Sequence, residues 1–202
     1  MELQVNRKKR NTGLLPGFEN RLVTPEDIKT EAVDPQAVHA LFDDCRRQMQ
    51  RLMDQSKAIA PRQFIREMVE LLQQCLEADY VLIADLDLQA STMQNVQGYG
   101  KTIGHFTGGI PLRPTSPFMG LADEECVIVP RNAQVRYGDS PYLLKYNINA
   151  LILHRIEVEG QTRGVIGAMN ITSFKHSEGI CTLLQKLAVF LAVYVYGADQ
   201  SG

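Results

Sequence analysis

The strongest constraint on the fold is a strand–strand–helix run that fills the last third of the chain. Residues 150–158 and 163–171 are rich in strand-forming residues, and the Gly-containing turn Glu159-Gly160-Gln161 joins them. A helix beginning near Ser177 follows, and it is apolar over most of its circumference. We expect this helix to be buried by the sheet on one side and by the first helices, or a second subunit, on another.

Two helices are predicted before the first strand. The first begins at Asp34-Pro35, because Asp is a good N-cap and Pro suits the first helical position. It carries a heptad seam of two heptads, too short for a stable coiled coil alone. We expect dimerisation through this seam, with packing inside the chain as the alternative. Pro61 ends or kinks this helix, and a broad apolar stripe over 64–76 predicts the second. The seam residues are Val38, Phe42, Cys45, Met49 and Leu52.

The centre of the chain holds a second hairpin and an irregular segment. Residues 80–87 and 94–100 are predicted to pair as strands. The segment 101–147 is rich in Gly and Pro and contains one short predicted strand, 126–130. Its many aromatic and apolar side chains indicate that it packs on the rest of the domain.

Composition narrows the function classes. The chain has 202 residues with 21 Lys+Arg against 23 Asp+Glu, which argues against a nucleic-acid binder. No apolar run approaches the roughly 20 residues of a membrane span, and the N-terminus does not resemble a secretion signal. Four widely spaced Cys indicate reduced thiols in a cytoplasmic protein.

The chain is expected to have three parts. We expect a mobile arm over 1–33, a dimerisation and signalling helix over 34–60, and one domain over 61–198. The basic cluster Arg7–Arg10 leaves open the alternative that the arm is a docking peptide for a partner.

The order of these elements resembles the GAF domain family over about residues 62–197. The family pattern is an apolar strand, a D/E-G turn, G-x-I-G-x-L-N-L, and a helix after a Phe-Thr/Ser-x-Glu cue. The chain matches it with Glu159-Gly160, then Gly164-Val165-Ile166-Gly167-Ala168-Met169-Asn170-Ile171, then Phe174 before Ser177-Glu178. Supporting matches are Ala78-Asp79 and the run 117–122 before 127–130.

The resemblance implies an α+β, profilin-like fold: a six-stranded antiparallel sheet with N- and C-terminal helices on one face and irregular loops on the other. Relatives hold small molecules between the sheet and the loops. The same lining also fits an ordinary filled core, and no particular cofactor is predicted. The candidate ligand-binding residues are Tyr99, His105, Phe118, Met119, Val129, Arg131, Tyr142, Tyr146 and His154.

Three further residues carry expectations of their own. Gly164 and Gly167 lie in a strand, where Gly costs stability, so something approaches the backbone closely there. We favour helix-on-sheet packing over ligand contact as the cause. His154 stands where many relatives have Pro, and a buried histidine satisfied by a carbonyl is favoured over a ligand contact.

The sequence predicts no catalytic residues and no metal site. No Cys precedes a His, as covalent bilin attachment requires in relatives, and Cys126 follows Asp123-Glu124-Glu125, whose charge disfavours a thiolate. The leading hypothesis is a dimeric, small-molecule-sensing regulatory module that signals to a protein partner by helix rearrangement. Two alternatives remain: a thiol-based reductase with Cys126 as nucleophile, and a ligand-free interaction scaffold whose pocket is filled by Phe118, Tyr142 and other side chains.

Overall fold

A computed structural model describes residues 35–171 and 177–197, so the expected arm over 1–33 lies outside the described residues. Six strands form one antiparallel sheet in the order β3-β2-β1-β6-β5-β4. The predicted α+β class and six-stranded antiparallel sheet are confirmed. The strands are β1 (Ala78–Asp87), β2 (Thr92–Gly100), β3 (Gly104–Pro111), β4 (Cys126–Val129), β5 (Leu151–Val158) and β6 (Gln161–Ile171).

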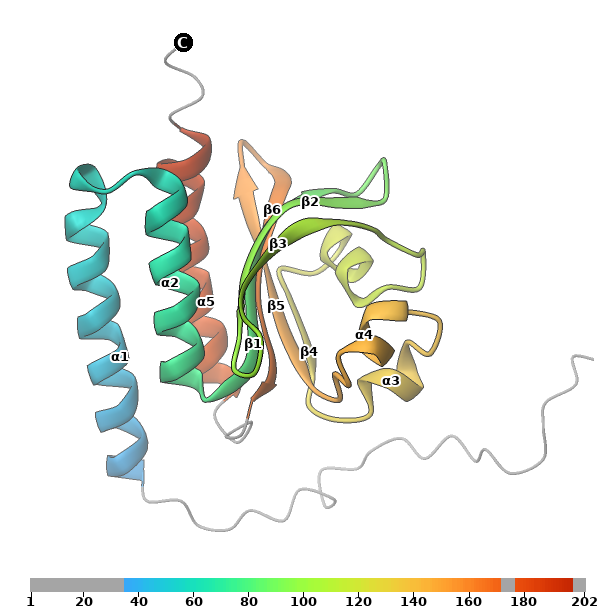
Figure 1. Ribbon diagram of the computed structural model, residues 1–202, viewed down its shortest axis with the longest axis horizontal. Coiled ribbons are helices and arrows are strands. Elements are labelled where there is room, and N and C mark those ends of the chain that lie inside the picture. The colour runs from blue at the N-terminus through green and yellow to red at the C-terminus, as the bar shows by residue number, and fades with distance from the viewer. Residues whose placement is uncertain (1–34, 172–176, 198–202) are drawn as a thin grey trace, which may run out of the picture. The chain divides into compact units, whose positions relative to one another are not determined.

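Helices cover one face of the sheet, as Figure 1 shows. They are α2 (Pro61–Leu76), α5 (Ser177–Leu191) and the π-helical end η5 (Ala192–Tyr196). Helix α1 (Pro35–Gln55) packs on the outer side of α2 and joins it through the short turn η2 (Ser56–Ala58). Alternate strand side chains, such as Val81, Ile152 and Ile166, join these helices in a helix-side core. Pro61 stands at the start of α2, and Glu77 ends that helix in the left-handed conformation.

The irregular segment covers the other face (Figure 1). It carries η3 (Pro117–Ala122), α3 (Ala133–Arg136) and α4 (Pro141–Lys145). The remaining strand side chains, including Leu82, Leu153 and Val165, pack with it in a lid-side core. Strands such as β1, β5 and β6 therefore contribute to both cores, because successive side chains point to opposite faces. We call residues 112–150 the lid.

Strand β3 is the main element that sequence analysis missed. Residues 104–111 were expected to be part of the irregular segment because they include Gly108, Gly109 and Pro111. In the structure they pair with β2 at the edge of the sheet, from Gly100↔Gly104 to Thr92↔Pro111. An edge position tolerates Gly and Pro because one side of the strand has no ladder to complete.

Helix α1 packs its seam within the chain. Cys45, Met49 and Leu52 are 2%, 1% and 8% exposed and belong to the helix-side core. Packing inside the chain, the stated alternative to dimerisation, therefore accounts for the burial of these three side chains. The side chains of Val38 and Phe42 lie outside the described residues.

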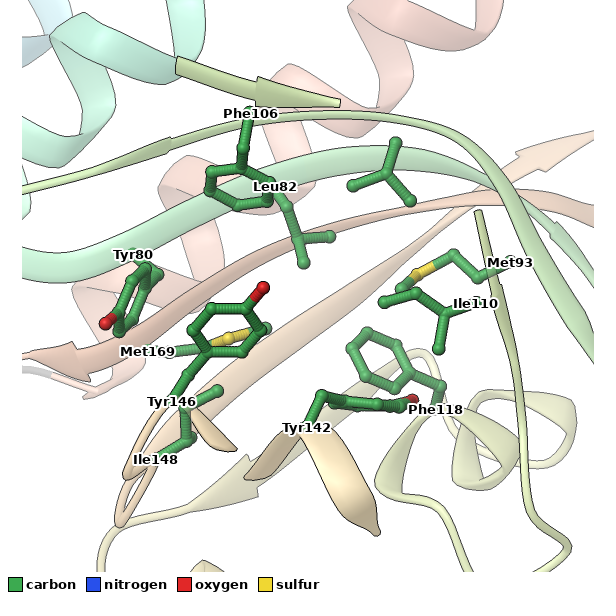
Figure 2. Close-up of a pocket in the computed structure, with 11 residues that line it drawn as sticks. Tyr80, Leu82, Met93, Phe106, Ile110, Phe118, Tyr142, Tyr146, Ile148 and Met169 are labelled. Atoms are coloured by element: carbon green, nitrogen blue, oxygen red, sulfur yellow. The ribbon is translucent and has the colours of Figure 1, made fainter. Parts of the chain in front are cut away.

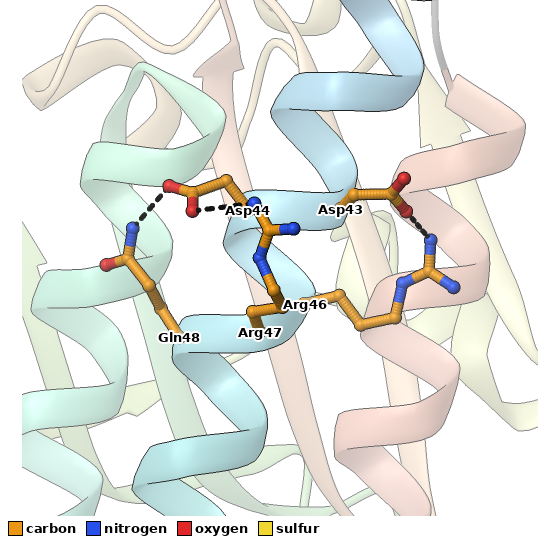
Figure 3. Close-up of polar contacts among 5 residues, drawn as sticks. All are labelled: Asp43, Asp44, Arg46, Arg47 and Gln48. Carbon is orange, nitrogen blue, oxygen red and sulfur yellow. Dashed lines mark hydrogen bonds and ion pairs between the residues drawn. The ribbon is translucent and has the colours of Figure 1, made fainter.

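The outer face of α1 is polar. Asp43 pairs with Arg46, and Asp44 accepts bonds from Arg47 at 3.3 Å and from Gln48 at 2.7 Å (Figure 3). All of these pairs are three or four residues apart, the spacing that places side chains on one helix face. Helix α1 therefore presents an apolar face to the domain and a charged face to its surroundings.

One helix differs from the sequence expectation about membranes. Ser177–Tyr196 is long and apolar enough to span a bilayer by length and composition. Six of its side chains are buried in the helix-side core, and an ordinary core helix passes the same test. The burial of this face gives a packing reason for the apolar composition.

The two strand glycines have different neighbours. A Cβ on Gly164 would lie 2.5 Å from the Tyr196 hydroxyl and 2.9 Å from the Ala84 carbonyl oxygen. That hydroxyl also donates to Asp85 at 2.7 Å, so the end of the last helix packs directly on the strand and confirms helix-on-sheet packing at Gly164. A Cβ on Gly167 would instead meet Leu153 at 2.7 Å, a neighbour within the sheet.

Candidate functional site

A small apolar cavity lies between the sheet and the lid (Figure 2). Its volume of about 40 Å³ has room for a water or two. The walls are aromatic, aliphatic and thioether groups. A molecule bound in the cavity would therefore be selected by its shape and by apolar contacts. The lining residues are Tyr80, Leu82, Met93, Val96, Phe106, Ile110, Phe118, Tyr142, Tyr146, Ile148 and Met169.

The floor of the cavity follows from strand alternation and register. Tyr80 and Leu82 are two residues apart on β1 and point to the lid face, and Met169 stands opposite Tyr80 on β6. Phe106 pairs with Gly98 across β2 and β3. A Cβ on Gly98 would lie 2.2 Å from the Phe106 ring, so the ring occupies the space that a side chain would take. Gly98 thus lets Phe106 lie over the sheet as a cavity wall.

The lid supplies the opposite wall. Tyr142 and Tyr146 are four residues apart, at α4 and its C-cap, so they share a side. Tyr142 packs on Phe118 with ring centroids 5.8 Å apart, and Tyr146 meets Tyr80 edge-on at 5.5 Å. Both contacts lie in the range that favours aromatic pairs. Figure 2 shows the four rings around the cavity.

A wider hollow adjoins this cavity between β3 and α4. It measures about 350 Å³, within the range of small-molecule sites. Among its described lining residues, Lys145 alone is charged, and its amino group lies 5.0 Å from the centroid of the Tyr146 ring. The hollow therefore combines apolar walls with a single cation. The two spaces share Val96, Phe106, Ile110, Tyr142 and Tyr146.

Three buried hydroxyl groups lie behind the Tyr142 wall. In the described part of the structure, the oxygens of Ser116, Ser140 and Tyr142 make no hydrogen bond. Burial raises the pKa of the Tyr142 hydroxyl, and the nearby Ser116 and Ser140 hydroxyls offset part of that increase without reaching hydrogen-bond geometry. These groups can accept or donate a bond to a water or a ligand hydroxyl.

Asn170 anchors the lid to the end of the sheet. Its Oδ1 accepts from the backbone N–H groups of Asn149 and Ala150 at 2.7 and 3.2 Å. Its Nδ2 donates to Asp79 and to the Asn147 carbonyl, both at 3.0 Å. A single side chain thus fixes the chain between α4 and β5, which carries Ile148 into the cavity wall.

Three of the nine predicted ligand-binding residues line the cavity: Phe118, Tyr142 and Tyr146. Met119 packs partly buried against the lid-side core, and Val129 is buried in that core without lining the cavity. Arg131 lies beyond the end of β4 and is exposed. Sequence analysis therefore identified three residues of the lid-side wall, but it also assigned to the site three nearby residues that do not line the cavity.

The other three predicted residues lie on the opposite face of the sheet. Tyr99 contacts His105 with ring centroids 4.9 Å apart, and His105 Nε2 is 3.3 Å from Glu70 on α2. His154 is buried and its Nδ1 donates to the Arg155 carbonyl at 2.8 Å, as the favoured structural interpretation predicted. These residues do not line the cavity because the sheet separates them from it.

Eight lining residues were missed by sequence reasoning. Most lie on strands, where alternation identifies a face but does not say which face meets the lid. Phe106 and Ile110 were missed because β3 itself was not predicted. The missed residues are Tyr80, Leu82, Met93, Val96, Phe106, Ile110, Ile148 and Met169.

Cys126 lies away from the cavity. It packs against the helix-side core, on the face of β4 opposite to Val127 and Val129. A thiol in this place cannot attack a substrate held between the sheet and the lid. The position removes the main support for Cys126 as the nucleophile of a reductase working in this cavity.

Comparisons with solved structures show the same fold. Free methionine-R-sulfoxide reductase from Neisseria meningitidis, in complex with its substrate, is 14% identical with a TM-score of 0.62, over 85% of this chain and 96% of that chain. The phycoerythrobilin-bound GAF domain of a cyanobacterial phytochrome is 14% identical with a TM-score of 0.58, over 78% and 97%. Residues 122 to 287 of a methyl-accepting chemotaxis protein are 15% identical with a TM-score of 0.59, over 74% and 97%.

Comparison with curated proteins finds no match. The sequence signature described as GAF domain matches residues 60–195, which is more than half of the chain. The match contains the whole sheet and the helices α2 and α5. This chain therefore belongs to the GAF domain family.

Proposed function

We propose that this GAF domain is a regulatory module that senses a small molecule with an apolar, flat body and an anionic group. The observation that carries the proposal is the apolar cavity adjoining a hollow with one cation, Lys145. The body of such a ligand would enter between Phe106 and Tyr146, and its anion would face Lys145. Structural relatives include a bilin-bound domain and a chemotaxis protein, which supports a sensory role.

Signal transfer would use the strands that serve both cores. On β1, Leu82 lines the cavity while its neighbours Val81 and Ile83 pack in the helix-side core. A ligand that moves β1 would therefore change the packing of α2 and α5. It can shift the helices only as far as it binds one arrangement more tightly than the other.

Dimerisation through the terminal helices remains part of the proposal, but not through the buried seam residues. On the C-terminal helix, Val189 and Val193 are 65% and 73% exposed and stand one turn apart. We propose this stripe as the contact. Val193→Asp is expected to lower the sedimentation-derived mass from dimer to monomer, whereas Lys101→Asp, in the exposed turn between β2 and β3, would not. A monomeric unmodified protein at micromolar concentration would contradict the dimer.

One observation favours the ligand-free scaffold as a second candidate. The inner cavity of about 40 Å³ is nearly filled by Phe118, Tyr142 and their neighbours. A ligand would have to displace side chains or occupy the outer hollow. Mass spectrometry of gently purified protein under native conditions separates the two candidates, since a co-purifying small molecule contradicts the scaffold.

A binding experiment tests the sensing proposal directly. The probes are 3-phenylpropionate and its neutral amide, titrated calorimetrically into the full chain. We expect the carboxylate to bind about two- to fivefold more tightly than the amide, the range of a partly exposed ion pair. Lys145→Met should abolish that preference, whereas Lys101→Met, outside the hollow, should preserve it.

A cavity-filling variant provides the second arm. Ile110→Phe narrows the junction of the two spaces and should weaken binding of both probes. Ile128→Phe adds the same volume on the exposed side of β4 and should leave binding unchanged. Equal affinity of all variants for both probes would overturn this assignment of ligand class and site.

A further inference from the structure

The four cysteines of the chain form two neighbouring pairs. Cys45 on α1 contacts Cys75 on α2, and Cys126 on β4 contacts Cys181 on α5. All four thiols are free, and all belong to or pack against the helix-side core. Their wide spacing in sequence gave no indication of pairing. Two adjacent thiols, unlike one, can be linked to each other when oxidised.

The register of β4 fixes the position of Cys126. Cys126 stands opposite His154 on β5, and the Arg155 N–H donates to the Glu125 carbonyl at 3.0 Å. This pattern makes Cys126 and His154 a non-hydrogen-bonded pair, in which the side chains lie closest together on one face. Ile152 and Ile156 lie in the helix-side core, so that face points to the helices. Helix α5 packs on β5 and carries Cys181 to the same place.

The two thiols of this pair differ in acidity. Their contact raises the pKa of the Cys126 thiol, and burial and the neighbouring Glu125 carboxylate act in the same direction. The same contact lowers the pKa of the Cys181 thiol, against the opposing effect of burial. The Glu125 carboxylate precedes Cys126 in the chain and disfavours its thiolate, so Cys181 is assigned the first attack, because the thiolate is the reactive form.

Access also distinguishes the pairs. Cys126 and Cys181 are both half-buried, so a small reagent can reach them from solvent. Cys45 is 2% exposed, on the buried face of α1 in the helix-side core. Cys75 is also half-buried, and its partner Cys45 lowers its pKa as Cys126 lowers that of Cys181. Susceptibility to oxidation also follows exposure, so the burial of Cys45 is what favours the Cys126/Cys181 pair.

We propose that Cys126 and Cys181 form a redox-active dithiol that a small hydroperoxide converts into a disulfide joining β4 to α5. The Cys181 thiolate attacks the peroxide, forming an S–O bond and breaking the O–O bond, which gives a sulfenic acid and hydroxide. Cys126 then attacks the Cys181 sulfur, forming the S–S bond and releasing water. Two thiols lose two electrons, and hydrogen peroxide is reduced to two molecules of water.

The disulfide would link helix α5, on one face of the sheet, to a strand whose other side chains pack on the opposite face. Val127 and Val129, the neighbours of Cys126 in β4, pack in the lid-side core. Among the described residues, strand β4 lies at the edge of the sheet and its pairing partner is β5. A covalent bond from β4 to α5 would therefore restrain this edge and the lid segment before it. The proposal does not depend on the ligand proposed above.

The test treats the reduced 202-residue chain with hydrogen peroxide, blocks remaining thiols with N-ethylmaleimide, and analyses non-reduced digests by mass spectrometry. We expect a cross-linked peptide containing Cys126 and Cys181 that dithiothreitol reverses. Alkylatable Cys126 and Cys181 should disappear about tenfold faster than alkylatable Cys45, because Cys126 and Cys181 are more exposed. Cys75→Ser serves as the matched control and should leave this cross-link unchanged.

A second variant follows the order of the steps. In Cys126→Ser, peroxide should produce a sulfenic acid at Cys181 that dimedone traps, because the resolving thiol is missing. The proposal is overturned if Cys126 and Cys181 stay fully alkylatable under peroxide, if they oxidise separately without a cross-link, or if Cys45 and Cys75 cross-link first. Circular dichroism of each variant confirms that the fold is retained during these measurements.

Discussion

At the residue scale, the four hydrogen bonds of the Asn170 side chain should stabilise the folded state. Removing the side chain leaves the N–H groups of Asn149 and Ala150 without their acceptor, and Ala is less tolerant of the left-handed conformation at φ 52°. We expect Asn170→Ala to reduce the free energy of unfolding in urea by about 2–4 kcal/mol.

Asn95 offers the matched control for that change. It also lies in a strand in the left-handed conformation, at φ 48°, but it is exposed and its side-chain hydrogen bond to Asp85 is at the surface. Asn95→Ala should therefore cost only about 1–2 kcal/mol, because water can replace the surface hydrogen bond and the conformational cost dominates. Equal losses for the two variants would mean that the lid anchor contributes nothing.

The contact between Gly98 and Phe106 gives a second prediction at this scale. Gly98→Ala places a methyl group where the Phe106 ring lies and should reduce the free energy of unfolding by about 1–3 kcal/mol, as overpacking does. Gly108→Ala is the control, because nothing lies within 4 Å of its added Cβ. Thermal unfolding compares the two; a stable Gly98→Ala would show that the ring is not confined.

At the scale of single elements, the outer face of α1 predicts a dependence on pH. Hydrogen bonds from Gln48 and Arg47 hold the pKa of Asp44 below its ordinary value of 3.8 (Figure 3). A lowered pKa in the folded state contributes stability above the unfolded value, and this stability is lost as the pH falls through the folded value. The stability difference between the unmodified chain and Asp44→Asn should therefore be present at neutral pH and vanish in acid.

Urea unfolding across that pH range measures this difference, and added salt provides the control. High salt should reduce the Arg47 part of the effect, because both side chains are exposed. A difference between the two proteins that is unchanged from neutral to acidic pH would contradict the role assigned to Asp44.

Elements that follow a strong local pattern could be predicted from the sequence, and elements defined by distant pairing could not. The broad apolar stripe of α2 and the turn at Glu159-Gly160 are local, and the structure contains both. Strand β3 forms only because β2 offers it a partner, so its own Gly-rich sequence carries little strand signal. Hydrophobic periodicity along the sequence identifies a helix or a strand, but it does not identify an edge strand that depends on a distant partner.

For the molecule as a whole, the same limit explains the mixed outcome at the candidate site. Phe118, Tyr142 and Tyr146 were found because a family resemblance pointed to the lid. Tyr99 and His154 were misplaced because alternation along a strand does not reveal which face the lid covers. The thiol pair Cys126/Cys181 joins residues 55 positions apart, which no local pattern could have indicated.

A mutation at Met49 tests whether helix α1 belongs to the core of one chain or to an interface between two chains. Met49 is 1% exposed within the single chain, so Met49→Ala should lower the free energy of unfolding by about 2–5 kcal/mol. Because the loss arises inside one chain, it should be the same at low and high protein concentration. Gln50→Ala, at the next and exposed position, should change stability by less than about 0.5 kcal/mol. Thermal unfolding at two concentrations a hundredfold apart decides the matter: a Met49→Ala effect that grows with concentration would assign this seam to a second subunit, since only an interface couples stability to mass action.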